Sequence, residues 1–135
     1  MPIALTAAAV CTLLTLGVAL FQFTLALGAS LGRYAWGGRF PATHPPAARV
    51  ASAVAGMVLL LVAGLYAGIV GLLPPLVGPA GRLLSIRVLT GLFALSTVGN
   101  LASRSRHERL VFTPITAMLL FANGVLLTFD GDAAW

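Results

Sequence analysis

The sequence predicts an all-α integral membrane protein, a bundle of four transmembrane helices that forms a single domain over residues 1–135. The first reason is composition, because 59% of the residues are hydrophobic and 8% are charged. Soluble domains run at roughly 45–50% apolar and about 25% charged residues. The second reason is pattern, because the apolar residues fall into four long runs separated by short segments rich in Arg, Gly and Pro. Lipid is the solvent that accommodates this excess of apolar surface.

Each apolar run is long enough to cross a membrane, whose ~30 Å hydrocarbon core needs about 20 helical residues. We predict spans at about residues 3–27, 50–73, 83–101 and 110–129. In the fourth span we expect Pro114 to kink or tighten the first turn of a helix that begins near Leu110.

The distribution of arginines predicts the orientation of these spans in the membrane. Six arginines fall in the segments after the first and third spans, and two fall in or near the third span on the other side. The six are Arg33, Arg39, Arg49, Arg104, Arg106 and Arg109, and the two are Arg82 and Arg87. Short cytoplasmic loops of membrane proteins carry the excess of Lys and Arg. We therefore expect residues 28–49 and 102–109 to be cytoplasmic and both termini to lie on the outer side.

The two cytoplasmic segments mix guanidinium groups with aromatic rings, which favours a position at the membrane interface. Anionic lipid head groups are the partners that such a surface attracts. The expected head-group contacts are Arg33, Arg39, Arg104, Arg106, Arg109, Tyr34 and Trp36. The alternative is that the arginines serve as topology determinants alone.

Three amide side chains lie inside predicted spans: Gln22, Asn100 and Asn123. Gln22 and Asn100 fall toward the cytoplasmic ends of their helices, so they have similar depth and could meet. A hydrogen bond between helices explains them structurally. A polar ligand site between helices is the functional alternative.

A salt bridge on the outer side is the predicted role of Arg87 and Asp130, which fall near the outer ends of neighbouring antiparallel spans. The alternative is that the Arg87 side chain extends alone to the interface.

Small residues in the second span predict close helix packing, centred on Gly64 and Gly68. Such stripes let helix backbones approach each other in membranes. Packing within the chain and association into a homo-oligomer, or with another membrane protein, both fit the stripe.

Several functions have no support in the sequence. A lone cysteine, Cys11, excludes an internal disulfide and zinc sites built on cysteine pairs. His44, His107 and Glu108 lack the spacing of metal ligands, so we expect no metal and no cofactor. The arginines are spread between apolar runs and form no basic face, which argues against nucleic acid as a partner. No acidic residue lies within a span, which disfavours a proton-coupled exchanger.

Residues 32–41 and 103–109, together with Pro114, resemble the corresponding segments of small bacterial membrane proteins with four spans. The resemblance implies a location in the bacterial inner membrane and implies no particular activity.

The leading functional hypothesis is a non-enzymatic membrane protein, either lipid-contacting or a partner-binding subunit. A small oligomeric channel or uncoupled transporter is the first alternative, and it would need the polar side chains to converge on a hydrated cavity. A membrane enzyme acting on a lipid is the second alternative. It would need a pocket on the cytoplasmic side that contains His44, His107 or Glu108.

Overall fold

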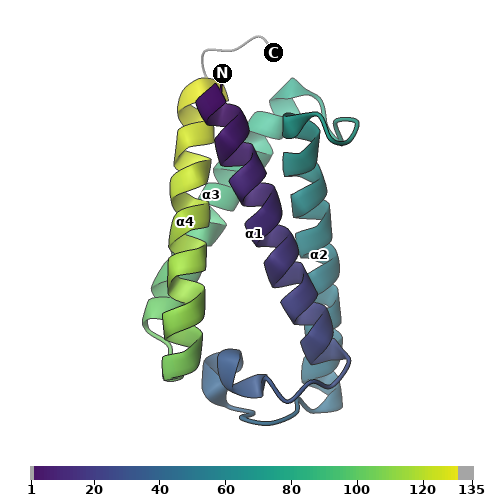
Figure 1. The fold of residues 1–135 in the computed structure, drawn as a ribbon, viewed down its shortest axis with the longest axis vertical. Helices are drawn as coiled ribbons and strands as arrows, with labels where there is room; N and C mark the ends of the chain where they lie inside the picture. The colour runs from purple at the N-terminus through teal and green to yellow at the C-terminus, as the bar shows by residue number, and fades with distance from the viewer. Residues whose placement is uncertain (1, 131–135) are drawn as a thin grey trace.

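The computed structural model describes residues 2–130, apart from the side chain of Asp130, and this part of the chain contains four long helices and no strand. The helices are α1 (Pro2–Ala26), α2 (Pro46–Val70), α3 (Pro79–Leu101) and α4 (Arg106–Asp130) (Figure 1). Each of them is long and apolar enough to cross a membrane. The predicted all-helical architecture is confirmed at this level, and the chain has the character of a multi-pass membrane protein.

Helix α1 is the centre of the bundle. It packs along α2 on one side and against α4 on the other, and α3 packs against α4 and crosses behind it in the view of Figure 1. Among the described residues, α2 and α3 make no extended contact although they are consecutive in the chain. The bundle is therefore less closed between α2 and α3 than between its other neighbouring helices.

The contact between α1 and α2 depends on small side chains. The buried residues of α1 are mostly small: Ala4, Ala7, Ala8, Cys11, Thr12, Thr15, Ala19 and Leu25. Gly56 of α2 lies so close to α1 that an added Cβ would stand 2.9 Å from the ring of Phe23. Small residues let helix backbones approach closely, which favours dispersion contacts in a bilayer.

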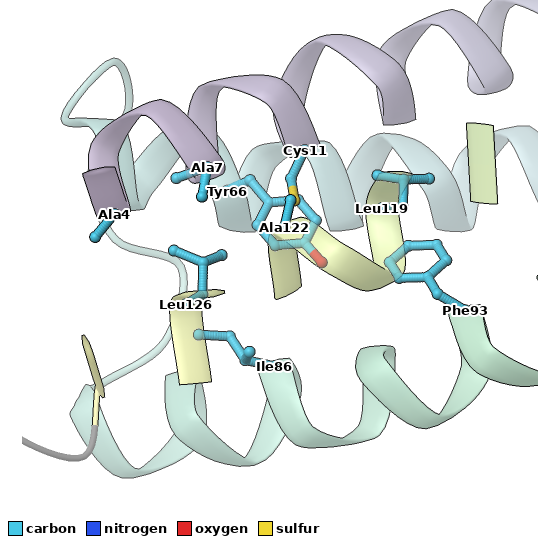
Figure 2. Close-up of a cluster of buried hydrophobic side chains, with 10 residues drawn as sticks. Ala4, Ala7, Cys11, Tyr66, Ile86, Phe93, Leu119, Ala122 and Leu126 are labelled. Atoms are coloured by element: carbon cyan, nitrogen blue, oxygen red, sulfur yellow. The ribbon is translucent and has the colours of Figure 1, made fainter. Parts of the chain in front are cut away.

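The hydrophobic core occupies the half of the bundle in which α1 begins. Figure 2 shows Cys11 of α1, Tyr66 of α2 and Ala122 of α4 packed together, with Ile86 and Phe93 of α3 reaching toward them. Tyr66 donates a hydrogen bond from its hydroxyl to Oδ1 of Asn123 at 2.8 Å, and both side chains are fully buried. In this half of the bundle, packed side chains fill the space between α1, α2 and α4.

Helix α4 begins at Arg106 rather than near Leu110. Ser105 caps its N-terminus, because the Ser105 hydroxyl accepts a hydrogen bond from the backbone N–H of Glu108 at 3.3 Å. A serine followed three residues later by glutamate is the pattern of a capping box. Pro114 therefore lies inside the helix, where it cannot donate to the carbonyl of Leu110.

The other boundaries differ from the predicted spans for local reasons. Helix α2 ends at Val70 because Gly71 adopts φ +83°, and Leu72 then donates to the carbonyl of Ala67 at 2.9 Å. This left-handed cap is a common helix end. Helix α3 begins at Pro79, since proline suits the first turn of a helix.

Candidate functional site

The arginine-rich end of the bundle is formed by the α1–α2 connection, the α3–α4 connection and the helix ends beside them. Hydrogen bonds join the two connections, which are far apart in the sequence. Ser105 donates from its hydroxyl to the carbonyl of Arg33. Gly37 donates its backbone N–H to Oε2 of Glu108 at 2.8 Å, and the Ser103 hydroxyl donates to the same oxygen at 2.5 Å. Figure 1 shows both connections at the end opposite the start of α1.

The α1–α2 connection contains two short 3₁₀ turns, Gly32–Tyr34 and Trp36–Gly38. Trp36, Gly37 and Gly38 have φ of +55°, +64° and +72°. Glycine adopts this left-handed conformation freely, whereas a tryptophan there stores strain of order 1 kcal/mol or more. The turn directs the N–H of Gly37 at Glu108 and leaves the Trp36 side chain 52% exposed.

The arginine rim consists of the five arginines at this end whose side chains are exposed: Arg33, Arg39, Arg104, Arg106 and Arg109. The guanidinium of Arg33 lies 5.3 Å from the ring centre of Tyr34, and that of Arg39 lies 5.6 Å from the ring of Phe40. These distances suit cation–π contacts. The predicted head-group residues therefore share one end of the molecule, with Tyr34 half-buried and Trp36 exposed.

Arg49 differs from the arginines of the rim because it is partly buried and bound to the end of α1. Its Nε donates to the carbonyl of Ala26 at 2.7 Å, and so satisfies a free carbonyl at the end of α1. Its guanidinium also covers Gly28, where an added Cβ would stand 3.4 Å from Cζ.

A cavity of about 430 Å³ lies behind the rim, between α1 on one side and α3 and α4 on the other. Its size is in the range of small-molecule sites. Tyr34, Ala35 and Gly37 border it at the arginine-rich end, and Thr15, Phe93 and Leu119 border it toward the core. The polar side chains that line it are Thr15, Gln22, Tyr34, Ser96, Asn100, Ser103, Glu108 and Thr116.

The cavity brings two of the three intramembrane amides together. Gln22 of α1 and Asn100 of α3 both line it, and no hydrogen bond of the Gln22 side chain is seen within residues 2–130. Asn100 uses Nδ2 for long hydrogen bonds to α4, at 3.5 Å to the carbonyl of Phe112 and 3.4 Å to the hydroxyl of Thr116. Asn123 lies elsewhere, in the core beside Tyr66.

The remaining predicted site residues lie away from the cavity. An added Cβ at Gly64 would stand 3.2 Å from Leu76, and one at Gly68 would stand 3.2 Å from Pro75, so both glycines face the α2–α3 connection. Arg87 is exposed on α3. The side chain of Asp130 is outside the described residues, so the Arg87–Asp130 salt bridge stays a prediction.

The two histidines have different surroundings. His44 is 3% exposed and lies edge-on to Phe40, with ring centres 5.7 Å apart. Burial lowers the pKa of His44 from its ordinary value of 6.5. His107 is exposed and lies edge-on to Tyr34 at 5.3 Å. Within the described part of the chain, no group of three or more His, Cys, Asp or Glu side chains is placed to hold a metal ion.

Sequence reasoning missed four features of this site: the cap at Ser105, the second donor at Ser103, the left-handed turn at Gly37 and the cavity residue Thr15. The Ser105 cap has a readable signal in the spacing Ser105 to Glu108. The Ser103 contact is also local, five residues from Glu108, but has no such motif. The roles of Gly37 and Thr15 depend on contacts between distant segments.

The fold and the site together define a four-helix, multi-pass type of membrane protein with an arginine-rich end and an adjoining open cavity. In comparisons with protein-family models, curated proteins and solved structures, nothing matched the chain. Its function therefore has to be argued from its own residues.

Proposed function

We propose that the protein is a non-enzymatic membrane protein that binds anionic lipids through its arginine rim. One observation carries the proposal. Five exposed arginines from two distant segments are held at one end of a bundle of membrane-length helices by the hydrogen bonds of Glu108 and Ser105.

Such a rim has the chemistry of an anionic surface contact. A Lys or Arg near a negatively charged membrane surface contributes about 1 kcal/mol of attraction. One guanidinium group can also donate two parallel hydrogen bonds to a phosphate, which the ammonium group of a lysine cannot do. Trp36 and Tyr34 beside the rim have the amphipathic rings that favour the head-group layer.

The orientation and location follow from the same charges. Six arginines lie at this end of the bundle and two lie toward the other end. We therefore propose that the rim faces the cytoplasm and that both chain termini lie outside. The resemblance to small bacterial proteins with four spans supports the bacterial inner membrane as the location.

The alternatives have weaker support. A pore through one chain would have to pass Asn123, which is fully buried and bonded to Tyr66 and to the carbonyl of Leu119. A lipid-converting enzyme would have to use Glu108, because neither histidine lines the cavity. One oxygen of that carboxylate already accepts two hydrogen bonds. A partner subunit that binds the rim in place of lipid is compatible with the same surface.

Native mass spectrometry of the detergent-purified protein during titration with dioleoylphosphatidylglycerol tests the proposal. Wild type should retain this anionic lipid in preference to dioleoylphosphatidylcholine, and 0.5 M salt should weaken the preference. Arg104 and Arg106 are exposed, and their side chains make no hydrogen bond or ring contact within residues 2–130, so replacing both should lower retention without unfolding the helix. The double variant Arg104→Gln, Arg106→Gln should bind several-fold more weakly than wild type.

Arg87→Gln provides the matched control, because Arg87 is an exposed arginine near the opposite end of the bundle. Its lipid retention should equal that of wild type. Equal retention of the anionic and zwitterionic lipids, or equal losses in the rim and control variants, would refute the proposal.

A further inference from the structure

The polar groups of the cavity include one that has no partner. Thr15 is fully buried and is one of the residues around the cavity, and its hydroxyl makes no hydrogen bond in the described structure. Thr12 and Thr116, in contrast, each donate to the carbonyl four residues earlier in their own helices, at 2.8 Å. A buried hydroxyl without a partner is unfavourable, because it has lost its hydrogen bonds to water and gained none in the protein. The free hydroxyl, the free amide of Gln22 and the weakly held amide of Asn100 make a set of uncharged hydrogen-bonding groups around one space.

The charges around the cavity indicate what it does not bind. No arginine lines it, and Glu108 is the one carboxylate among its lining residues. A phosphate group inside would therefore lack a cation and would face a negative charge. A buried ion without a partner is strongly unfavourable. The hydrogen-bonding groups suit a ligand whose polar end is neutral, with hydroxyl or carbonyl oxygens.

The rest of the lining is apolar. Phe21 and Phe112 form one wall with their ring centres 4.9 Å apart. Leu59 of α2 and Phe93 of α3 also line the cavity. A second hollow, of about 470 Å³, lies between α2 and α3 and is lined almost wholly by aliphatic side chains. It lies next along the same helices, because its Val58 adjoins Leu59 in the sequence and its Leu89 is about one turn from Phe93. Its lining residues include Val58, Leu61, Leu65, Leu84, Val88 and Leu89.

The polar groups of the cavity and the aliphatic lining of the second hollow together suit a lipid with a neutral head and one hydrocarbon chain. We propose that the cavity binds a neutral lipid of the monoacylglycerol class, with its hydroxyl and ester oxygens at Thr15, Gln22 and Asn100. Its hydrocarbon chain lies in the apolar hollow between α2 and α3, where these helices make no extended contact and leave access from the bilayer. This inference does not depend on anionic lipids binding at the rim, because the two sites use different residues.

Blocking the cavity is the direct test. Gly99 lines the cavity, and a Cβ added there meets nothing within 4 Å, so Gly99→Phe should fill the space without straining the helix. Gly91 is also an exposed helical glycine of α3 with nothing within 4 Å, but it does not line either hollow. Gly91→Phe is therefore a matched control.

The probe is 1-monooleoylglycerol, titrated into the delipidated, detergent-purified full chain and followed by native mass spectrometry. Wild type and Gly91→Phe should bind it equally, and Gly99→Phe should bind it at least about tenfold more weakly. The double variant Arg104→Gln, Arg106→Gln should bind it as wild type does, which separates this site from the rim. No binding to wild type, or equal binding to the two glycine variants, overturns the proposal. A preference for oleoyl lysophosphatidylglycerol that survives the loss of Arg104 and Arg106 also overturns it.

Thr15→Val keeps the test decisive if the phenylalanine variants do not fold. Valine has nearly the shape of threonine and removes the unpartnered hydroxyl, so the ligand-free variant should be as stable as wild type or more stable. Binding of 1-monooleoylglycerol should nevertheless fall several-fold. If binding is unchanged in Thr15→Val, the hydroxyl does not contact the lipid and the proposed pose is wrong.

Discussion

Glu108 accepts a hydrogen bond from the backbone N–H of Gly37 at 2.8 Å, which ties the first turn of α4 to a loop 71 residues earlier in the chain. The Ser103 hydroxyl reaches the same carboxylate oxygen at 2.5 Å. Glu108 therefore holds together the two connections that carry the arginine rim, and its backbone N–H is part of the α4 cap. Glu108 thus caps α4 through its backbone N–H, binds the loop through its carboxylate and lines the cavity.

Replacing Glu108 should release the 32–38 segment. Glu108→Ala removes the acceptor of Gly37 and Ser103, and hydrogen bonds to a charged group contribute about 1.5–3 kcal/mol each at most. Because Glu108 is partly exposed, we expect a total loss of about 1–2 kcal/mol. Hydrogen–deuterium exchange of residues 32–38 should become faster, while exchange in α2 stays unchanged. Arg104→Ala is the control, and equal exchange in both variants would contradict the role of Glu108.

Gly32 should tolerate no side chain. An added Cβ would stand 1.7 Å from the carbonyl oxygen of Phe40 and 2.6 Å from that of Ala42, and both of these atoms belong to the backbone. Gly32→Ala therefore forces the α1–α2 connection to change its path, and the thermal midpoint in detergent should fall clearly. Gly17→Ala should leave the midpoint unchanged or raise it, since Gly17 has nothing within 4 Å of an added Cβ. A Gly32→Ala protein as stable as wild type would show that the loop has a different conformation.

Tyr66 and Asn123 should be energetically coupled. Their hydrogen bond of 2.8 Å joins α2 to α4 in a fully buried part of the core. Hydrogen bonds between helices in membranes are worth about 0.6–2 kcal/mol. A double-mutant cycle with Tyr66→Phe and Asn123→Leu, measured by unfolding in a denaturing detergent, should give a coupling energy of that size. Strict additivity of the two losses would mean that the bond contributes nothing.

The apolar runs predicted the helices well because every backbone group in a bilayer needs a partner inside its own helix. The arginine-rich end was predictable for a similar reason, since guanidinium groups are costly within hydrocarbon. Gln22 and Asn100 were expected at similar depth, and both line one cavity. These predictions depend on each residue's distance along its own span.

Contacts between helices were not predictable in the same way. The small-residue stripe at Gly64 and Gly68 predicted close packing, either within the chain or in an oligomer. Within the chain these glycines lie beside the α2–α3 connection, and association with a second chain stays a prediction. The close approach of α1 and α2 occurs at Gly56, against Phe23. Small residues are frequent in all the spans, so sequence alone does not say which of them face a neighbouring helix. The lack of extended contact between α2 and α3 was unpredictable for the same reason, because the sequence does not say which helices pack against α1.

Acid should destabilise the α1–α2 connection through His44. This side chain is 3% exposed, and neither ring nitrogen has a hydrogen-bond partner within residues 2–130. Burial lowers the pKa of His44 below its ordinary value of 6.5, so the folded protein holds the neutral ring in a range where the unfolded chain is already protonated. Because the unfolded state binds more protons there, the free energy of unfolding must fall as the pH drops through 6.5. The loss ends once the pH is below the lowered pKa of the folded state.

The pH dependence of the thermal midpoint between pH 8 and pH 5 measures this effect. Wild type should be most stable above the ordinary histidine pKa of 6.5 and should lose stability below it. His44→Phe keeps an aromatic ring beside Phe40 and removes the titrating group, so its midpoint should depend less on pH over this range. His107→Phe changes an exposed ring and should keep the wild-type dependence. If His44→Phe keeps the wild-type dependence on pH, burial of His44 has no measurable consequence.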